Sequence, residues 1–338
     1  MREALHHGGA LDAALARYGG ARADWLDLST GINPAPPPVP EIDPALWARL
    51  PERALEERAR RALRRFAGAG EGAGIALAPG TQALIALLPH LLPPGPAAVL
   101  CPSYEEHGRA LAQAGHAVAR FADLSDIPPE ARLVTLVSPN NPDGRRFERS
   151  AVLALADRLA AQGGLLVLDE AFADAEPGTS LAAEAGRPGL LVLRSFGKFF
   201  GLAGLRFGAA LGEPALTARI EARFGPWAVS GPALAIASAL MEDVAGIEAL
   251  REGIGQRAEW TRQALAAAGL EPVGGTALFS LVSVPDAFGL FDGLARRHVL
   301  TRPFAYRPDW LRLGTVRNAH EAERLTAALR AALAEATG

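Results

Sequence analysis

The chain has 338 residues, of which 49% are hydrophobic and 21% are charged, and its formal net charge at pH 7 is −3. These values are typical of a globular enzyme with one large and one small domain, and they make a nucleic-acid partner unexpected. One cysteine, Cys101, allows no internal disulfide, and no apolar stretch is long enough to span a membrane, so we expect a cytoplasmic protein without a membrane partner.

Short apolar runs alternate with helical patterns between about residues 50 and 230. Segments 54–66 and 148–161 carry apolar side chains at helical spacing. Such alternation is typical of a mostly parallel sheet covered by helices, because strands buried on both faces are apolar throughout. We expect strands at 75–78, 97–101, 117–121, 132–137, 165–169, 190–194 and 206–211.

The pattern changes after about residue 232, where fewer strands alternate with longer helices. A long helical stretch is expected over roughly 232–268, then a strand at 277–283, a helix near 288–298, a strand near 311–314 and a helix near 319–335.

These elements predict an α/β chain with three parts. Residues 1–30 form an N-terminal segment that covers the cleft or joins the small domain. Residues 31–231 form a large domain with a mostly parallel central sheet between helices. Residues 232–338 form a smaller α+β domain.

Lys198 is the only lysine of the chain, which has 34 lysine and arginine residues together. Arginine keeps its proton in proteins, whereas a lysine amine can lose it and attack a carbonyl. One lysine could remain by chance in an arginine-rich chain, but its neighbours favour a function. An expected strand leads to Ser195, Lys198 follows three residues later, and Arg206 follows eight residues after that. These three side chains could surround a carbonyl and a phosphate.

Two other expected strands also end in polar residues. One leads to Asp169, and another leads to a turn that contains Asn141. Taken alone, Asp169 could be a helix cap, and the Asn-Pro-Asp-Gly sequence could be simple turn chemistry. In a parallel sheet, however, ligands bind beyond the carboxyl ends of the strands. The sequence therefore predicts that these residues meet Lys198.

Together, Asp169, Ser195-Phe-Gly-Lys198, Arg206 and the upstream Asn141-Pro resemble the fold type I pyridoxal-phosphate (PLP) enzymes, the aspartate aminotransferase superfamily. The resemblance covers nearly the whole chain and implies that fold, with PLP as the cofactor and no metal. Lys198 would bind the cofactor aldehyde and move protons at the substrate carbon. Asp169 would keep the pyridine nitrogen protonated, and Asn141 would donate to the ring oxygen. Ser195 and Arg206 would hold the cofactor phosphate.

The resemblance also assigns two further segments to the cofactor. Residues 78–88 read as a strand, a turn and a helix, whose start at Gly80, Thr81 and Gln82 would offer N–H groups to the phosphate. Tyr104 stands where an aromatic ring stacks on the cofactor, although a position in the core would explain it equally well.

Two branches of this superfamily fit the chain, the histidinol-phosphate aminotransferases and the L-threonine-O-3-phosphate decarboxylases of cobalamin biosynthesis. The decarboxylases are closer, because His7-Gly-Gly9 followed by residues 28–34 resembles their opening sequence. Segments 106–115, 168–172 and 225–230 are also similar to that branch. The resemblance implies a PLP-dependent carbon–carbon lyase, with an aminotransferase as the alternative. The complete set of cofactor residues makes a non-catalytic binding protein unexpected.

In both branches the substrate carries a phosphate, so the resemblance implies a second anion site, and the expected partner is a small phosphorylated amino-acid substrate. Its candidate ligands are His7, Asn33, Arg302 and Arg312, since an arginine fork matches a carboxylate or phosphate. Which anion each arginine binds stays open. Their geometry would also select the reaction, because the bond that breaks is the one held perpendicular to the cofactor ring.

The chain departs from the pattern of both branches at one position. They carry a tyrosine in an Arg-Tyr-Pro sequence that reaches the cofactor phosphate from the neighbouring subunit, and here the sequence is Arg49-Leu50-Pro51. Phe172 also replaces a tyrosine that many aminotransferases use to bind the ring oxygen. A homodimer with active sites at the subunit interface is still implied.

Overall fold

The computed structural model describes residues 8–176 and 178–337. The chain divides into two compact units. The large unit contains Pro36–Asn141 and Arg145–Leu250, and the C-terminal unit contains Met1–Ala35, Pro142–Gly144 and Arg251–Gly338. Among the described helices, none combines the length and the apolar character needed to cross a membrane.

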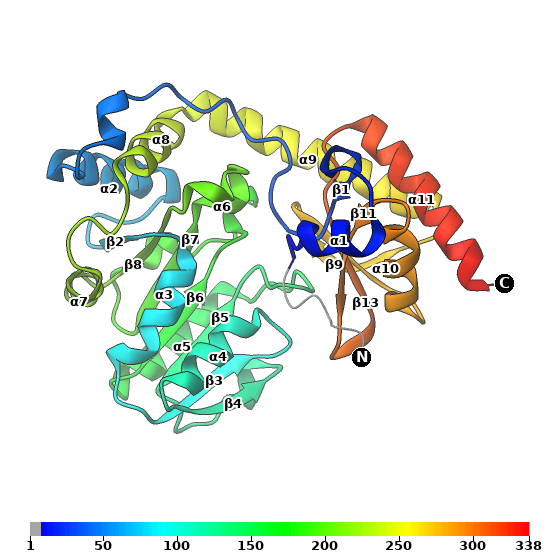
Figure 1. Ribbon diagram of the computed structural model, residues 1–338. Coiled ribbons are helices and arrows are strands. Elements are labelled where there is room, and N and C mark those ends of the chain that lie inside the picture. The colour runs from blue at the N-terminus through cyan, green and yellow to red at the C-terminus, as the bar shows by residue number, and fades with distance from the viewer. Residues whose placement is uncertain (1–7, 177, 338) are drawn as a thin grey trace. The chain divides into compact units, whose positions relative to one another are not determined.

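The large unit contains a seven-stranded sheet in which only β8 runs against the other strands (Figure 1). All seven strands expected from the sequence are present, each within two residues of its expected bounds. Most of them are buried along their whole length, which explains why their sequences are mostly apolar. In sheet order they are β2 (Gly74–Ala78), β8 (Gly208–Gly212), β7 (Leu190–Ser195), β6 (Leu165–Asp169), β5 (Leu133–Val137), β3 (Pro96–Leu100) and β4 (Ala117–Phe121).

Helices cover this sheet, and two of them, α3 and α4, lie on the face turned to the viewer in Figure 1. Ile85 of α3 and Leu111 of α4 pack on that face against Leu133 and Val167 in one hydrophobic cluster. The two helices expected at 54–66 and 148–161 are confirmed as α2 and α5. The helices of the unit are α2 (Arg53–Ala67), α3 (Thr81–Leu87), α4 (Glu105–Gln113), α5 (Arg149–Ala161), α6 (Phe196–Phe199), α7 (Pro214–Phe224) and α8 (Gly231–Glu242).

The helical stretch expected over 232–268 is confirmed, and the structure divides it into two helices. The first, α8, ends at Glu242, and α9 spans Val244–Ala267. Asp243 between them has a non-helical backbone, with φ −83° and ψ 86°. Its Oδ1 accepts a hydrogen bond from the Gly246 N–H at 2.9 Å, and its carbonyl accepts the Ile247 N–H. Asp243 therefore begins α9 as an N-cap, a position that favours aspartate.

The C-terminal unit contains a four-stranded antiparallel sheet in the order β12-β13-β10-β9. The strand expected at 277–283, the helix at 288–298 and the helix at 319–335 are confirmed as β10, α10 and α11. The strand expected at 311–314 is longer and begins at Arg307. The elements are α1 (Leu11–Tyr18), β1 (Leu26–Asp27), β9 (Pro272–Thr276), β10 (Phe279–Ser283), α10 (Ala287–Ala295), β11 (Val299–Leu300), β12 (Arg302–Phe304), β13 (Arg307–Gly314) and α11 (Ala319–Thr337).

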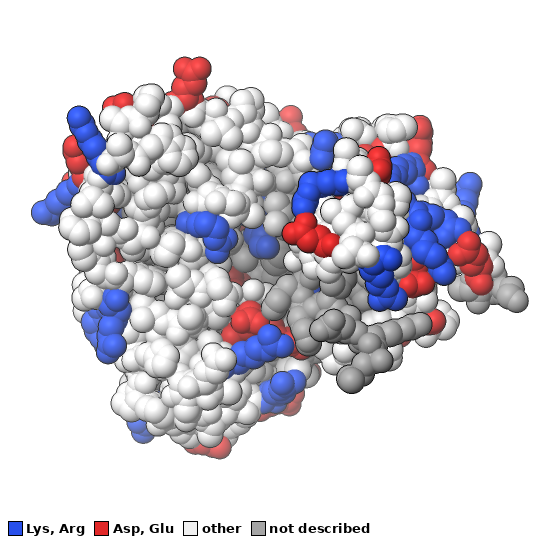
Figure 2. Space-filling view, in the orientation of Figure 1, with Lys and Arg blue, Asp and Glu red and all other residues white. Residues whose placement is uncertain are grey.

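Charged side chains of both signs are interspersed over the face seen in Figure 2. Many of them form ion pairs across elements, such as Arg58 with Glu242 at 2.7 Å and Arg187 with Asp157 at 3.0 Å. Mixed, paired charges are typical of an ordinary solvated surface.

Candidate active site

The sheet of the large unit brings its polar residues to one edge. Strands β3, β5, β6 and β7 are parallel, so the segments that follow them leave the sheet at the same side. Within that edge, Asp169 pairs with Val137 on one side and Leu193 on the other. Because β8 is antiparallel, its first residue, Gly208, pairs with Ser195 at the same edge.

The residues expected to hold a phosphate lie together at this edge. Gly80 packs so closely on Arg206 that a Cβ there would stand 2.7 Å from the guanidinium, and its φ of +82° also favours glycine. A Cβ on Gly208 would stand 2.8 Å from the backbone nitrogen of Thr81. Ser195 is the cross-strand partner of Gly208. The structure thus brings the start of α3, Arg206 and Ser195 to one small region.

Asp169 is buried, and its partner is His107, a residue to which the sequence pattern gave no role. His107 Nε2 lies 2.8 Å from Asp169 Oδ2, and both side chains are at most 5% exposed. The other carboxylate oxygen accepts the Ala171 N–H at 3.0 Å. His107 and Leu111 are the buried positions of α4, at a spacing of four residues. That spacing is the only sequence signal for His107, and it marks a core face equally well.

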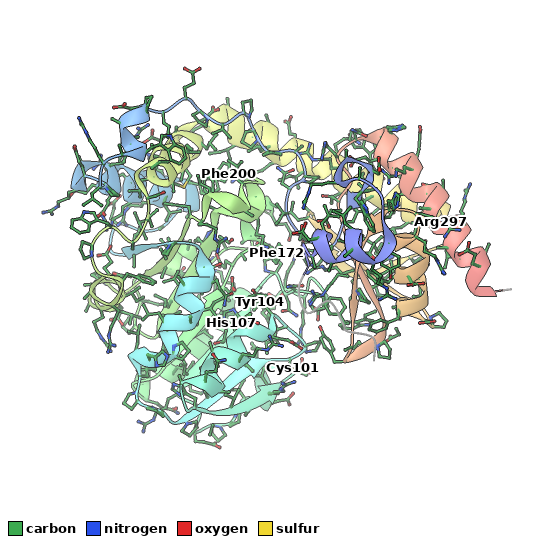
Figure 3. All side chains as sticks on the ribbon, in the orientation of Figure 1. Cys101, Tyr104, His107, Phe172, Phe200 and Arg297 are labelled. Atoms are coloured by element: carbon green, nitrogen blue, oxygen red, sulfur yellow. The ribbon has the colours of Figure 1, made fainter. Side chains whose placement is uncertain are left out.

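Tyr104 lies directly before α4, and Figure 3 shows it beside His107. The two rings meet edge to face, with centroids 6.0 Å apart. The Tyr104 hydroxyl donates a hydrogen bond to Gln82 Oε1 at 3.1 Å, which connects two of the predicted cofactor residues. The half-buried Tyr104 ring is therefore held at the sheet edge.

The turn that carries Asn141 is fixed through its neighbour, Asn140. The Asn140 side chain is buried, and its Oδ1 accepts the Ser103 hydroxyl at 2.7 Å. Its Nδ2 donates to the Pro102 carbonyl at 3.0 Å. These bonds join the turn after β5 to the turn after β3 and position the half-buried Asn141 beside them.

Lys198 lies in α6, the short helix that follows β7. Its neighbours Gly197 and Phe199 are buried, while Lys198 itself is half-buried. Its Nζ stands 5.9 Å from the centre of the Phe172 ring. A Cβ on Gly197 would meet Ala203 Cα at 2.6 Å, so the backbone directly before the lysine is closely packed.

A buried ion-pair network supports the segment after Asp169, and the sequence analysis assigned no role to it. Arg194 donates to Glu170 at 2.6 Å and also pairs with Asp174. The Ser180 hydroxyl and the Leu181 N–H each donate to Glu170 at 2.6 Å. Burial alone would lower the pKa of Arg194, but the two carboxylates more than offset it, so the pKa is raised. The network fixes the loop that begins at Asp169.

The C-terminal unit places two predicted substrate ligands side by side. Arg302 and Arg312 are direct cross-strand partners on β12 and β13. Arg312 is buried, and its NH2 donates to the Ser29 carbonyl at 2.7 Å. Burial and the nearby Arg302 together lower the pKa of Arg312 to about 10. Like charges directly opposite each other are unfavourable in a sheet, so this pair suits an anionic ligand.

The other two predicted substrate ligands belong to the N-terminal part of the same unit. Asn33 is 1% exposed, and its Oδ1 accepts the Ala35 N–H at 3.1 Å. His7 lies outside the described residues. Gly9, two residues later, donates its N–H to the Ser29 hydroxyl at 2.7 Å. The Ser29 segment therefore contacts both the start of the described chain and Arg312.

The arrangement in the large unit suits PLP, the cofactor that the resemblance implies. Asp169 is a buried carboxylate whose side chain accepts from His107 and one backbone N–H, and a carboxylate can accept further donors such as a protonated pyridine nitrogen. The glycine contacts of Gly80 and Gly208 bring backbone N–H groups close to the Arg206 guanidinium, as a phosphate requires. Lys198 supplies the one side-chain amine.

Comparisons with known proteins agree with this chemistry. The family model "Aminotransferase class I and II" matches residues 24–331. The chain is 46% identical to a threonine-phosphate decarboxylase from Sinorhizobium sp. over 331 residues, which cover 97% of this chain and 98% of the relative. It is 43% identical to a threonine-phosphate decarboxylase from Pseudomonas aeruginosa over 327 residues, covering 96% and 97% of the two chains.

The fold is also that of a solved structure with the cofactor bound. Histidinol-phosphate aminotransferase from Sinorhizobium meliloti, in complex with pyridoxal-5'-phosphate, matches with a TM-score of 0.79 and 23% identity, covering 96% of this chain and 94% of that one. The sequence match, the sheet topology and the residues at the sheet edge lead to one conclusion: the chain belongs to the class I and II aminotransferase family and has the fold of the type I PLP-dependent enzymes.

Proposed function

We propose that this chain is a PLP-dependent lyase of cobalamin biosynthesis. It would convert L-threonine O-3-phosphate to (R)-1-amino-2-propanol O-2-phosphate and carbon dioxide. The observation that carries the proposal is the similarity, over nearly the full length, to two threonine-phosphate decarboxylases. The paired arginines of the C-terminal unit support it, because this substrate carries both a phosphate and a carboxylate.

In the large unit, the proposed roles follow from the chemistry of each side chain. PLP, when bound, draws electrons from the bond that breaks at the substrate α-carbon. Lys198 Nζ would hold the cofactor through its aldehyde. Once the substrate amine has taken its place there, Lys198 Nζ would deliver a proton to the α-carbon from which the carboxylate leaves as carbon dioxide. The Asp169 carboxylate would face the pyridine nitrogen, and His107 holds that carboxylate in place.

The remaining cofactor residues bind and orient. Asn141 would donate to the ring oxygen of the cofactor. The buried Phe172 would leave that bond to Asn141 alone, because a phenylalanine has no hydroxyl. Tyr104 would cover the cofactor ring, and its hydroxyl donates a hydrogen bond to Gln82. The phosphate ligands are the backbone at the start of α3, the side chains of Thr81 and Ser195, and the Arg206 guanidinium.

For the substrate, we propose Arg302 and Arg312 as the ligands of the two anions, with Asn33 and His7 completing the site. Their task is to turn the carboxylate rather than the α-hydrogen to the position where its bond breaks. That orientation would separate decarboxylation from transamination on the same cofactor.

We also propose a cytoplasmic homodimer with active sites at the subunit interface. Three large apolar side chains of the large unit support a partner surface, since Trp47 is 73% exposed, Leu50 62% and Trp227 52%. Leu50 cannot donate to the cofactor phosphate, so this proposal leaves the phosphate to Thr81, Ser195 and Arg206.

The test of the proposed reaction is the product formed from L-threonine O-3-phosphate by PLP-loaded protein without an oxo-acid acceptor. We expect catalytic release of carbon dioxide together with aminopropanol phosphate, in equal amounts. Absence of carbon dioxide from protein that shows the cofactor's absorbance would contradict the decarboxylase. Histidinol phosphate with an oxo acid would then be the next reaction to measure.

The close packing of Gly208 on Thr81 gives a test of the phosphate site. We expect Gly208→Ala to raise the dissociation constant of PLP about tenfold, because the new methyl group pushes the Gly80–Thr81 turn away from β8. The dissociation constant is measured from the cofactor absorbance. Gly204→Ala is the matched control, since no atom lies within 4 Å of a Cβ at that position. Equal affinities of the two variants would contradict the assignment.

A further inference from the structure

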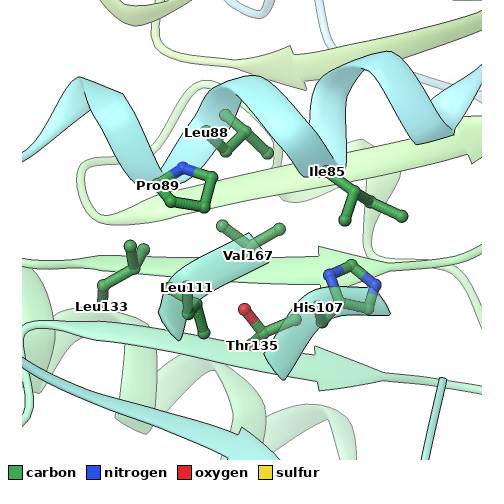
Figure 4. Close-up of a pocket in the computed structure, with 8 residues that line it drawn as sticks. All are labelled: Ile85, Leu88, Pro89, His107, Leu111, Leu133, Thr135 and Val167. Carbon is green, nitrogen blue, oxygen red and sulfur yellow. The ribbon is translucent and has the colours of Figure 1, made fainter. Parts of the chain in front are cut away.

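A small cavity of about 10 Å³ lies within the large unit, between the sheet and helices α3 and α4 (Figure 4). Eight residues line it, and the only polar side chains among these eight are His107 and Thr135. Most of the others belong to the hydrophobic cluster between the sheet and these helices. The cavity therefore presents two polar groups in an otherwise apolar surrounding.

Thr135 lies in the middle of β5, between Val99 of β3 and Val167 of β6. It is 3% exposed, and Figure 4 shows its hydroxyl directed into the space among the lining side chains. No hydrogen bond joins this hydroxyl to another residue in the described part of the chain. A buried hydroxyl without a partner is costly, so a partner is expected in the cavity.

The two ring nitrogens of His107 face different neighbours. Its Nε2 is bonded to Asp169, and Figure 4 shows the opposite nitrogen, Nδ1, turned toward the other lining side chains. An ionised carboxylate only accepts hydrogen bonds, so the proton of the neutral ring belongs on Nε2. Nδ1 is then an acceptor that faces the same cavity as the Thr135 hydroxyl.

We propose that one water molecule occupies this cavity and joins the Thr135 hydroxyl to His107 Nδ1. The volume matches a single water, and two polar partners are enough to hold it. The water donates to Nδ1 and accepts from or donates to the hydroxyl, which is free to rotate. Thr135 thereby becomes a positioning residue, because the bond to Nδ1 keeps the proton on Nε2.

The consequence concerns Asp169. A His107 ring fixed in this tautomer donates to Oδ2 at all times and holds the carboxylate in one orientation. Only the last step, in which Asp169 faces the cofactor nitrogen, rests on the proposed function. The water and the tautomer are properties of the chain without cofactor.

The first test is the ring-nitrogen spectrum of His107 in the full-length, cofactor-free protein labelled with ¹⁵N-histidine. The seven histidines are separated by assigning the signal that His107→Gln removes. We expect Nε2 to be protonated and Nδ1 to show the shift of a hydrogen-bonded acceptor. In Thr135→Val the ¹⁵N chemical shift of Nδ1 should move to the value of an acceptor without a hydrogen bond. Thr135→Ser should keep the chemical shift of the unsubstituted protein.

Thr217→Val is the matched control, because Thr217 is also 3% exposed but its hydroxyl is bonded to carbonyls of its own helix. It should leave the His107 signal unchanged. The same variants are then titrated with PLP, and Thr135→Val should raise the dissociation constant about fivefold, the loss expected for one hydrogen bond.

An unchanged His107 spectrum in Thr135→Val would overturn the proposal. Should that variant fail to fold, a high-resolution crystal structure of the unsubstituted protein decides, because absence of a water between Thr135 and His107 would also overturn it. These readouts need no turnover. A His107 response in a protein that releases no carbon dioxide would reject the proposed reaction and keep this inference.

Discussion

Lys198→Arg is expected to lower the rate of carbon dioxide release by at least about 10³-fold while leaving the fold intact. Arginine keeps the positive charge but cannot lose its proton to attack an aldehyde. The Lys198 side chain is half-buried, with Nζ 5.9 Å from the centre of the Phe172 ring. We therefore expect the larger guanidinium to fit without disturbing the core. The rate is measured with L-threonine O-3-phosphate and saturating PLP.

The single lysine makes a chemical test unusually direct. Borohydride treatment of the PLP-loaded protein should attach one pyridoxyl group per chain to Lys198, and peptide mass spectrometry locates it. The variant should carry none on a side chain. The matched control is the double variant Lys198→Arg with Arg223→Lys, which moves the lysine to an exposed position on α7. Substantial activity in either variant would contradict the assigned role.

The sequence predicted the large unit well for a physical reason. Its central strands are buried on both faces and so appear as continuous apolar runs, and each run ends where the chain must turn. A parallel sheet collects those turns at one edge. The sequence therefore predicts that Asp169, Ser195 and Lys198 lie close together, because strand direction alone decides the edge at which they lie.

Other features depend on contacts that no local pattern contains. His107 reaches Asp169 across 62 residues of sequence, and a buried helix position gives the same pattern whether its neighbour is a carboxylate or a leucine. The pairing of Arg302 with Arg312 depends on the register of a hairpin whose register shifts between Pro303 and Phe304. Register is set by side-chain packing and turn geometry, which sequence spacing does not fix there.

That arginine pair leads to a second large effect, in which stability and function change in opposite directions. Arg302→Met should raise the KM for L-threonine O-3-phosphate about 100-fold, the loss expected for a charge-assisted two-point contact. The same change should raise the free energy of unfolding of the substrate-free protein by about 0.5 kcal/mol, since it removes the positive charge opposite Arg312. Steady-state kinetics and urea unfolding give the two quantities.

The chemistry of the two anions then distinguishes Arg302 from Arg312. Aminopropanol phosphate keeps the phosphate and lacks the carboxylate, so its inhibition should weaken only when the arginine that binds the phosphate is replaced. Arg312→Met completes the comparison, and Arg297→Met is the control, because Arg297 pairs with Glu335 at the surface of the same unit. If both substitutions left KM near that of the control, the pair would have to be structural.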